Sequence, residues 1–273
     1  GFVSKEAFLE GFDGGDIPDK GYILTFYDGF SDHFKYVFPE LIKRGLWGLF
    51  YIPTLPHETG QILDVHRIHH LLGMHGGAPL LEASQRLIKT DMSTHSKVED
   101  FHQLTYITQQ NDDATLLFKR VLNYFLSSEG RKIVIDQLMK EFSLASEQDL
   151  LWEYYATPEQ IATMNDAGMI IGSHTVNHSV MSKLSVMDQK NEIESSFEFL
   201  ENLLGLLPKR SFCYPHGGFH TFDHDTERLL DEAGCQFSFN VEARRISEND
   251  IVNRPQALPR YNCNMYPHGQ VRI

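Results

Sequence analysis

Two patterns of apolar and polar residues alternate along the chain. Short apolar runs at 21–29, 46–54 and 169–174 are typical of buried strands, and the segments 209–215 and 235–242 are also predicted to be strands. Segments whose apolar residues recur every three or four positions, typical of amphipathic helices, occur at 34–45, 157–168, 185–205 and 225–234. Strands that alternate with helices predict parallel βα units, in either a (β/α) barrel or an open doubly wound sheet.

Capping residues support two of these helices. Thr157 precedes Pro158, and Gln160 completes a capping box, while Gly168 ends the periodic segment. Ser185 opens the second helix and Gly205 ends it. We therefore expect both helices to begin and end near these residues.

The region from about 61 to 152 breaks the alternation. It is polar and helical in pattern, with apolar positions spaced for helices around Leu117–Phe125 and Ile135–Phe142, and no convincing strand. We predict a single domain over 1–273 that contains a helical insertion at about 61–152. The insertion serves either as packing or as a lid over a substrate cleft.

Composition and charge exclude several classes of partner. The formal net charge of −13 argues against a nucleic-acid or anionic-membrane partner. No apolar run approaches the roughly 18 residues that a membrane span needs. The first residues carry no recognisable signal peptide, and the three cysteines form no disulfide or zinc-ribbon pattern. We therefore expect a cytoplasmic protein.

Histidines suggest candidate metal sites, because two imidazoles four residues apart can bind one ion. This spacing occurs at His66/His70, His174/His178, His216/His220 and His220/His224. The first pair lies in a leucine-rich helical stretch that favours packing, and His216, His220 and His224 lie in a glycine-containing loop. Only His174 and His178 follow an apolar strand directly.

Asp28 also ends a predicted strand, and functional sites of parallel α/β folds form at the carboxyl ends of strands. One carboxylate and two imidazoles, with one position open to water, are typical of a catalytic divalent-metal site. Asp28, His174 and His178 are therefore the predicted ligands.

Three segments carry a family resemblance. TFYDG (25–29), SHTVNH (173–178) and FCYPHG (212–217) resemble, in order, the motifs TFDDG, HS/TxxH and RxPYG of the polysaccharide deacetylases of carbohydrate esterase family 4, which are NodB-like. LPRYNC (258–263) is also similar to the end of such domains. The resemblance implies a distorted (β/α) barrel with fewer than eight strands. It also implies hydrolysis of the N-acetyl group of a sugar or polysaccharide with zinc or another divalent metal (cobalt, manganese or nickel), in the assembly of a surface glycan.

The resemblance assigns further roles. Asp28, His174 and His178 match the metal ligands, and the backbone N–H of His216 matches the donor that stabilises the oxyanion. The resemblance also places four residues on the substrate side of the site: Tyr214, Pro215, Gly217 and Arg260.

The general-base position departs from the family pattern. Tyr27 occupies the place of the base aspartate, and Cys213 occupies the place of the arginine that pairs with it. A phenol with a pKa near 10 donates a proton at neutral pH and does not accept one. His268 is the nearest candidate for the family's general acid, in unlike surroundings, and Asp32 and His216 are the nearest alternative bases.

Four interpretations follow from this departure. The protein is a working deacetylase in which the metal suffices or another group acts as base, or a metal- and glycan-binding relative without turnover. Alternatively it hydrolyses another small amide or imide, or it is a structural α/β domain. Acetate release, turnover of small ureides or imides, metal binding and the behaviour of Tyr27→Asp distinguish them.

Overall fold

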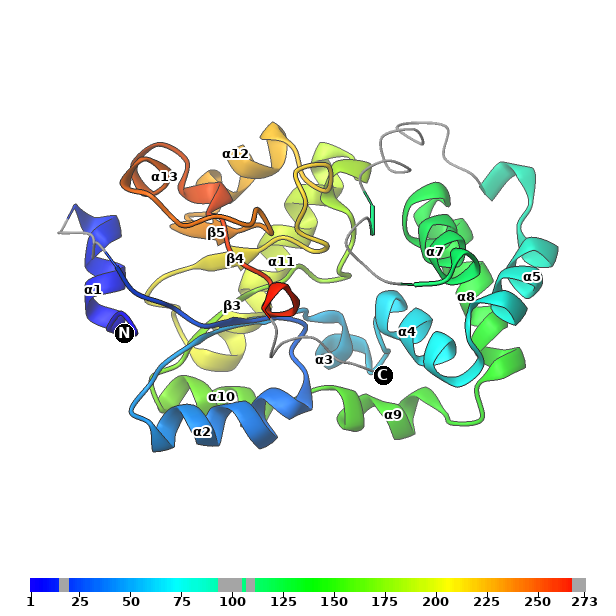
Figure 1. Ribbon diagram of the computed structural model, residues 1–273, viewed down its shortest axis with the longest axis horizontal. Helices are drawn as coiled ribbons and strands as arrows, with labels where there is room; N and C mark the ends of the chain where they lie inside the picture. The colour runs from blue at the N-terminus through cyan, green and yellow to red at the C-terminus, as the bar shows by residue number, and fades with distance from the viewer. Residues whose placement is uncertain (15–19, 93–104, 107–110, 267–273) are drawn as a thin grey trace. The chain divides into compact units, whose positions relative to one another are not determined.

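The computed structural model describes residues 1–14, 20–92, 105–106 and 111–266. The chain forms two compact units. The barrel unit comprises Gly1–Thr59 and Trp152–Ile273, and the helical unit comprises Gly60–Leu151. The chain therefore leaves the barrel unit once and returns to it once (Figure 1).

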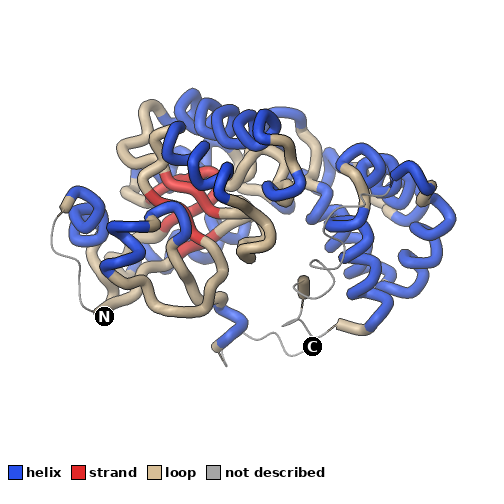
Figure 2. The backbone as a smooth tube through the Cα atoms, turned by 90° about the horizontal axis from the view of Figure 1, so that it is seen from above, coloured by secondary structure: helices blue, strands red, loops and turns tan. Residues whose placement is uncertain are grey.

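Five parallel strands form the sheet of the barrel unit, shown in red in Figure 2. They are β1 (Thr25–Phe26), β2 (Leu49–Ile52), β3 (Ile170–Ser173), β4 (Ser211–Cys213) and β5 (Phe237–Phe239), in this spatial order. Every residue of β2, β4 and β5 is buried, including Ser211 and Ser238, as expected for a parallel sheet covered on both faces. Because neighbouring strands are parallel, their carboxyl ends lie at one edge of the sheet.

Helices pack around this sheet within the barrel unit (Figures 1 and 2). They are α1 (Lys5–Glu10), α2 (Phe38–Lys43), α3 (Leu55–Thr59), α10 (Pro158–Asp166), α11 (Val186–Leu204), α12 (His224–Glu232) and α13 (Glu248–Asn253). A capping box at Thr157 opens α10, and the Ser185 hydroxyl accepts from the Asp188 amide at the start of α11. The predicted capping of both helices is confirmed.

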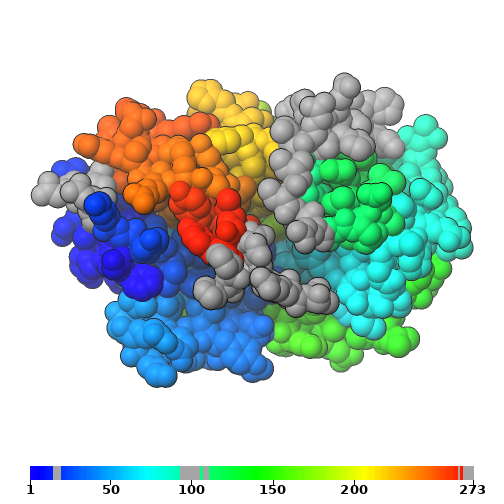
Figure 3. Space-filling view, in the orientation of Figure 1, coloured from blue at the N-terminus to red at the C-terminus, as the bar shows by residue number. Residues whose placement is uncertain are grey.

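The two edges of the sheet are linked by the segment that follows α13. Leu258 pairs with Phe239 of β5, and Arg260 then donates a hydrogen bond to the Asn240 carbonyl (3.0 Å). The guanidinium also reaches the hydroxyl of Thr25 in β1 (3.5 Å). In the space-filling view this segment, in orange to red, lies beside the blue N-terminal part of the chain (Figure 3).

The helical unit contains its own apolar core, which includes Ile68, Leu80, Phe118 and Leu138. Its helices are α4 (Asp64–His75), α5 (Gly77–Leu87), α7 (Asp113–Arg120), α8 (Ser128–Phe142) and α9 (Glu147–Tyr154), whose end belongs to the barrel unit. No strand is present in the described part of 60–151. The reading of this region as an insertion within one domain stays a prediction.

A buried arginine connects three helices of this unit. The side chain of Arg67 is 6% exposed and contacts Asp64 (3.3 Å), Asp136 (2.8 Å) and Glu147. A buried charge requires such partners, because removing an ion from water is costly. His66, next to it, is buried in α4, in agreement with a packing role.

Two predicted elements differ from the structure. The strand predicted at 21–29 is limited to Thr25–Phe26, because Asp28 adopts a left-handed conformation (φ 73°) that ends it. The helix predicted at 34–45 begins as a π-helical turn, His33–Val37, and continues as α2. Pro39 lacks the N–H group that a regular helical bond would need there. No described helix of the chain is long and apolar enough to cross a membrane.

Candidate metal centre

Asp28 lies just beyond the carboxyl end of β1, in a backbone conformation that few non-glycine residues adopt. Its φ is 73°, and that of Gly29 is 63°. Two successive left-handed residues turn the chain sharply away from the sheet. Residues held in this region cost free energy and persist where the surroundings fix them, frequently at functional sites. The carboxylate is 13% exposed.

His174 and His178 lie on the loop after β3. The His174 amide donates to Ile52 O (3.0 Å), which continues the β2–β3 pairing. His178 has a φ of 54°, and its amide donates to the Thr175 hydroxyl (2.9 Å). Glu192 of α11 accepts from the amides of Val176 (2.9 Å) and Asn177 (2.8 Å), so hydrogen bonds fix the loop between the two histidines.

The structure brings the three predicted ligands together. One donor atom from each of Asp28, His174 and His178 lies within 4.8 Å of the others. Asp28 Oδ1 is 3.5 Å from His174 Nε2 and 3.2 Å from His178 Nε2. One carboxylate and two imidazoles form a donor set that suits zinc and related divalent ions.

The hydrogen bond of His174 favours metal binding through Nε2. Its Nδ1 lies 2.6 Å from the Cys213 carbonyl, which can only accept, so Nδ1 carries the proton and Nε2 presents a lone pair to Asp28. Burial lowers the pKa of His174 to about 4, although Asp28 acts in the opposite direction. The imidazole is therefore neutral at pH 7, as a metal ligand must be.

Tyr27 is partly buried beside this centre, and Arg260 lies over its ring. The Arg260 guanidinium lies 4.4 Å from the centroid of the Tyr27 ring, a cation–π contact, and the ring lies 5.8 Å from that of His174. Burial raises the pKa of Tyr27 above its ordinary value, although Arg260 opposes the shift. Tyr27 is thus a neutral phenol. Sequence reasoning missed this stack, because the two residues are distant in the chain.

Cys213 and His216 both lie at the carboxyl end of β4. Burial raises the pKa of the Cys213 thiol to about 11, so this side chain is neutral. His216 has a φ of 61°, and its ring centroid lies 4.9 Å from that of His178. Of the two alternative bases named from the sequence, His216 lies next to the proposed ligands. Asp32 is exposed and forms no hydrogen bond or ion pair with them among the described residues.

Three of the four residues placed on the substrate side are buried, and Arg260 is partly exposed. Tyr214 is 1% exposed, stacks on Phe222 and donates its hydroxyl proton to the Gln256 carbonyl (2.5 Å), an arrangement that belongs to the core. Pro215 and Gly217 are also buried. Gly217 has a φ of 75°, and a Cβ there would lie 2.5 Å from Val241, so only glycine fits.

The other histidines singled out from the sequence lie on different elements. His66, His69 and His70 lie on α4 of the helical unit. His224 is exposed at the start of α12, and His268 lies outside the described residues. Sequence reasoning missed His33, whose ring packs against Phe26 and Phe50 and whose pKa burial lowers to about 4. No spacing signal pointed to it.

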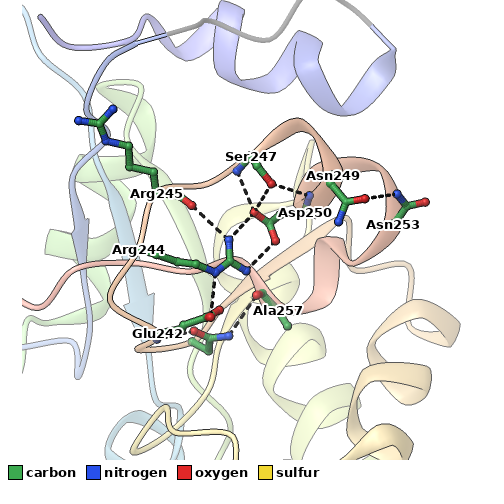
Figure 4. Close-up of polar contacts among 9 residues, drawn as sticks. Glu242, Arg244, Arg245, Ser247, Asn249, Asp250, Asn253 and Ala257 are labelled. Carbon is green, nitrogen blue, oxygen red and sulfur yellow. Dashed lines mark hydrogen bonds and ion pairs between the residues drawn. The ribbon is translucent and has the colours of Figure 1, made fainter.

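A second polar cluster lies on the loop after β5 (Figure 4). Arg244 contacts Asp250 through two hydrogen bonds (2.7 and 2.8 Å) and Glu242 through an ion pair (2.8 Å). Asp250 also accepts from the amide and the hydroxyl of Ser247 (2.8 and 2.7 Å). The bonds with Arg244 hold the pKa of Asp250 well below its usual range. Arg244 therefore already supplies the positive charge that faces the two carboxylates of this cluster.

The sequence and the fold were each compared with those of known proteins. The sequence matches the polysaccharide deacetylase family over residues 14–238. Among solved structures, the fold is similar to the deacetylase PplD of Streptococcus pyogenes, solved with acetate (TM-score 0.54, 15% identity, 96% of this chain and 73% of that one).

Two further structures are similar. They are the deacetylase domain of BpsB from Bordetella bronchiseptica (TM-score 0.54, 12% identity, 95% and 78% covered) and IcaB from Ammonifex degensii (TM-score 0.50, 17% identity, 96% and 76% covered). No curated protein matches the sequence. With the five-stranded parallel sheet, these similarities confirm the predicted distorted (β/α) barrel.

Proposed function

Because the chain belongs to the polysaccharide deacetylase family, we propose that it hydrolyses the N-acetyl group of a sugar or polysaccharide in a reaction that depends on a divalent metal. The observation that carries the proposal is the convergence of Asp28, His174 and His178. A divalent metal held by these three residues would acidify water and polarise the amide carbonyl. Zinc is the proposed ion, with cobalt, manganese and nickel as alternatives, and surface-glycan assembly is the proposed role.

The residues around the metal centre have separate tasks in this proposal. The Cys213 carbonyl keeps the proton of His174 on Nδ1, which leaves Nε2 available as a ligand. The backbone N–H of His216 is the proposed donor to the oxyanion that forms when water adds to the carbonyl carbon. The C–N bond then breaks, the amine takes a proton, and acetate leaves.

Proton transfer is the step in which this chain departs from its family. Tyr27 is a partly buried phenol that cannot accept a proton at neutral pH. We propose His216 as the group that accepts the proton of the attacking water, because its ring lies beside that of His178. Asp32 is the less favoured candidate, because its side chain is exposed and does not contact the proposed ligands.

One observation favours a second candidate function. Tyr27 fills the base position with a ring fixed by Arg260, and general-base catalysis typically contributes about 10²–10⁴-fold to a rate. If no other group replaces the base, the same site would bind a metal and an acetylated glycan without appreciable turnover.

Acetate release from a panel of N-acetylated oligosaccharides, in the presence of zinc, tests the first candidate. We expect release by the wild-type protein and none by His174→Ala. His224→Ala is the matched control, because His224 is exposed and distant in sequence from the ligands, and it should retain wild-type activity. Release by His174→Ala at the wild-type rate would contradict the proposal, and zinc binding without release would favour the second candidate.

A further inference from the structure

The two segments that connect the barrel unit to the helical unit contact the loops that carry the proposed ligands. The exit segment, 54–59, follows β2 and leads into the helical unit, and the return segment, 152–156, leads back from it. Both segments belong to the barrel unit. Each is hydrogen-bonded to a different ligand loop.

The exit segment binds the loop between the two histidines. The amide of Thr54 donates to Thr175 O (3.1 Å), and that of Leu55 donates to Val176 O (3.1 Å). Both acceptors lie between His174 and His178. The loop is therefore bonded on one side by the exit segment and on the other by Glu192.

The return segment binds the turn that follows Asp28. The amide of Ala156 donates to Gly29 O (2.9 Å), and the hydroxyl of Ser31 donates to Glu153 O (2.5 Å). Phe30 and Tyr155 form an antiparallel bridge, and their rings stack with centroids 6.5 Å apart. The three residues immediately after Asp28 are thus paired with Glu153, Tyr155 and Ala156 of the return segment.

An aromatic cluster joins the two segments. The ring of His57 in the exit segment lies 6.0 Å from Trp152 and 6.5 Å from Tyr155, and it stacks on Phe199 of α11 (5.8 Å). Neither ring nitrogen of His57 has a hydrogen-bond partner in the described part of the chain. His57 therefore acts as an aromatic packing group between the segments.

We propose that the exit and return segments form one brace that sets the positions of Asp28, His174 and His178, with Ser31 and Trp152 as positioning residues for the metal. The inference rests on the proposed metal site. Asp28, Thr175 and His178 all have positive φ values, and such conformations persist only where other contacts hold them. The brace supplies those contacts at both loops.

A serine substitution tests the return half of the brace. Ser31→Ala removes the bond to Glu153 O, and we expect the zinc dissociation constant, measured by competition with a chelating dye, to rise about tenfold, as for other groups that orient ligands. Ser182→Ala is the matched control. It removes a similar hydrogen bond, from the Ser182 hydroxyl to the carbonyl of His220 (2.7 Å), which lies far away in the sequence and outside the brace. Its zinc affinity should equal that of the wild type.

A tryptophan substitution tests the junction of the segments. Trp152 is 46% exposed, so Trp152→Ala should fold. We expect weaker zinc binding by about tenfold in Trp152→Ala and recovery in Trp152→Phe, which retains a ring against His57. Equal zinc affinity in wild type, Ser31→Ala and Trp152→Ala would overturn the inference while leaving the proposed function intact.

Hydrogen exchange of the wild-type protein gives an independent test. If the brace and the ligand loops form one unit, zinc should slow exchange at the amides of Thr54, Leu55 and Ala156 by at least about fivefold, and not in α13. Slowing confined to the ligand loops would overturn the inference. A wild-type protein that binds no zinc would instead overturn the proposed function, and the inference with it.

Discussion

Two polar clusters of the barrel unit have similar burial and opposite electrostatic character. The carboxylate of Asp28 is 13% exposed and that of Asp250 is 9% exposed. Asp250 faces a guanidinium and a helix N-terminus, so its cluster is complete within the chain. Asp28 faces two imidazoles, of which His174 is neutral. A carboxylate beside two imidazoles is suited to binding an external cation, whereas a carboxylate paired with arginine is suited to fixing the conformation of a loop.

The largest expected effect comes from removing the same charge in each cluster. Asp28→Asn takes away the anionic ligand and should weaken zinc binding by at least about 100-fold, more than loss of an orienting group does. Asp250→Asn, an identical change at a similarly buried carboxylate, should leave zinc affinity unchanged. Isothermal titration of each variant with zinc measures the two dissociation constants. Equal losses would show that the first cluster is not a distinct cation site.

The substitution Tyr27→Asp tests whether the lack of a carboxylate base at this position limits the rate of hydrolysis. The new carboxylate would face the Arg260 guanidinium that now lies on the Tyr27 ring, and a paired carboxylate remains ionised and able to accept a proton. We expect acetate release to increase by about 10²-fold. Tyr27→Phe, which keeps the ring and adds no base, is the control and should match the wild type. A fall in rate for both variants would indicate that the phenol takes part in turnover.

These expectations also show what could be anticipated from the sequence. Asp28, His174 and His178 were predicted as neighbours because each follows a strand, and the ends of parallel strands meet at one edge. The capped helices were predicted because capping is local. The contact between Tyr27 and Arg260, and the pairing of Ser31 with Glu153, join residues far apart in the chain and have no local signal.

The two substitutions should rank in the opposite order for stability: Asp250→Asn should destabilise the protein more than Asp28→Asn. Asp250→Asn weakens charge-assisted bonds to Arg244 and Ser247, and it should lower the free energy of unfolding by about 1 kcal/mol, a modest value because Arg244 is 43% exposed. When both variants are free of metal, Asp28→Asn should lower the free energy of unfolding by less than Asp250→Asn does. Urea unfolding with a chelator present measures both. A larger loss for Asp28→Asn would mean that its cluster is mainly structural.

The smallest expected effect is a pH dependence of the Asp250 contribution. The pKa of Asp250 is lower in the folded chain than in the unfolded chain, chiefly because of Arg244. The contribution is therefore complete above about pH 4, the unfolded pKa, and is lost as the pH falls toward the folded value. The difference in unfolding free energy between wild type and Asp250→Asn should shrink below about pH 4. A constant difference down to low pH would contradict the ionic account.

A crystal structure of the protein grown with zinc, with an anomalous difference map recorded at the zinc edge, tests the metal centre most directly. We predict one strong peak about 2.0–2.2 Å from an Asp28 oxygen, from His174 Nε2 and from a ring nitrogen of His178. The map of His174→Ala under the same conditions should lack it. Absence of a peak at these residues in the wild-type crystal, with the protein active in acetate release, would contradict the proposed metal centre.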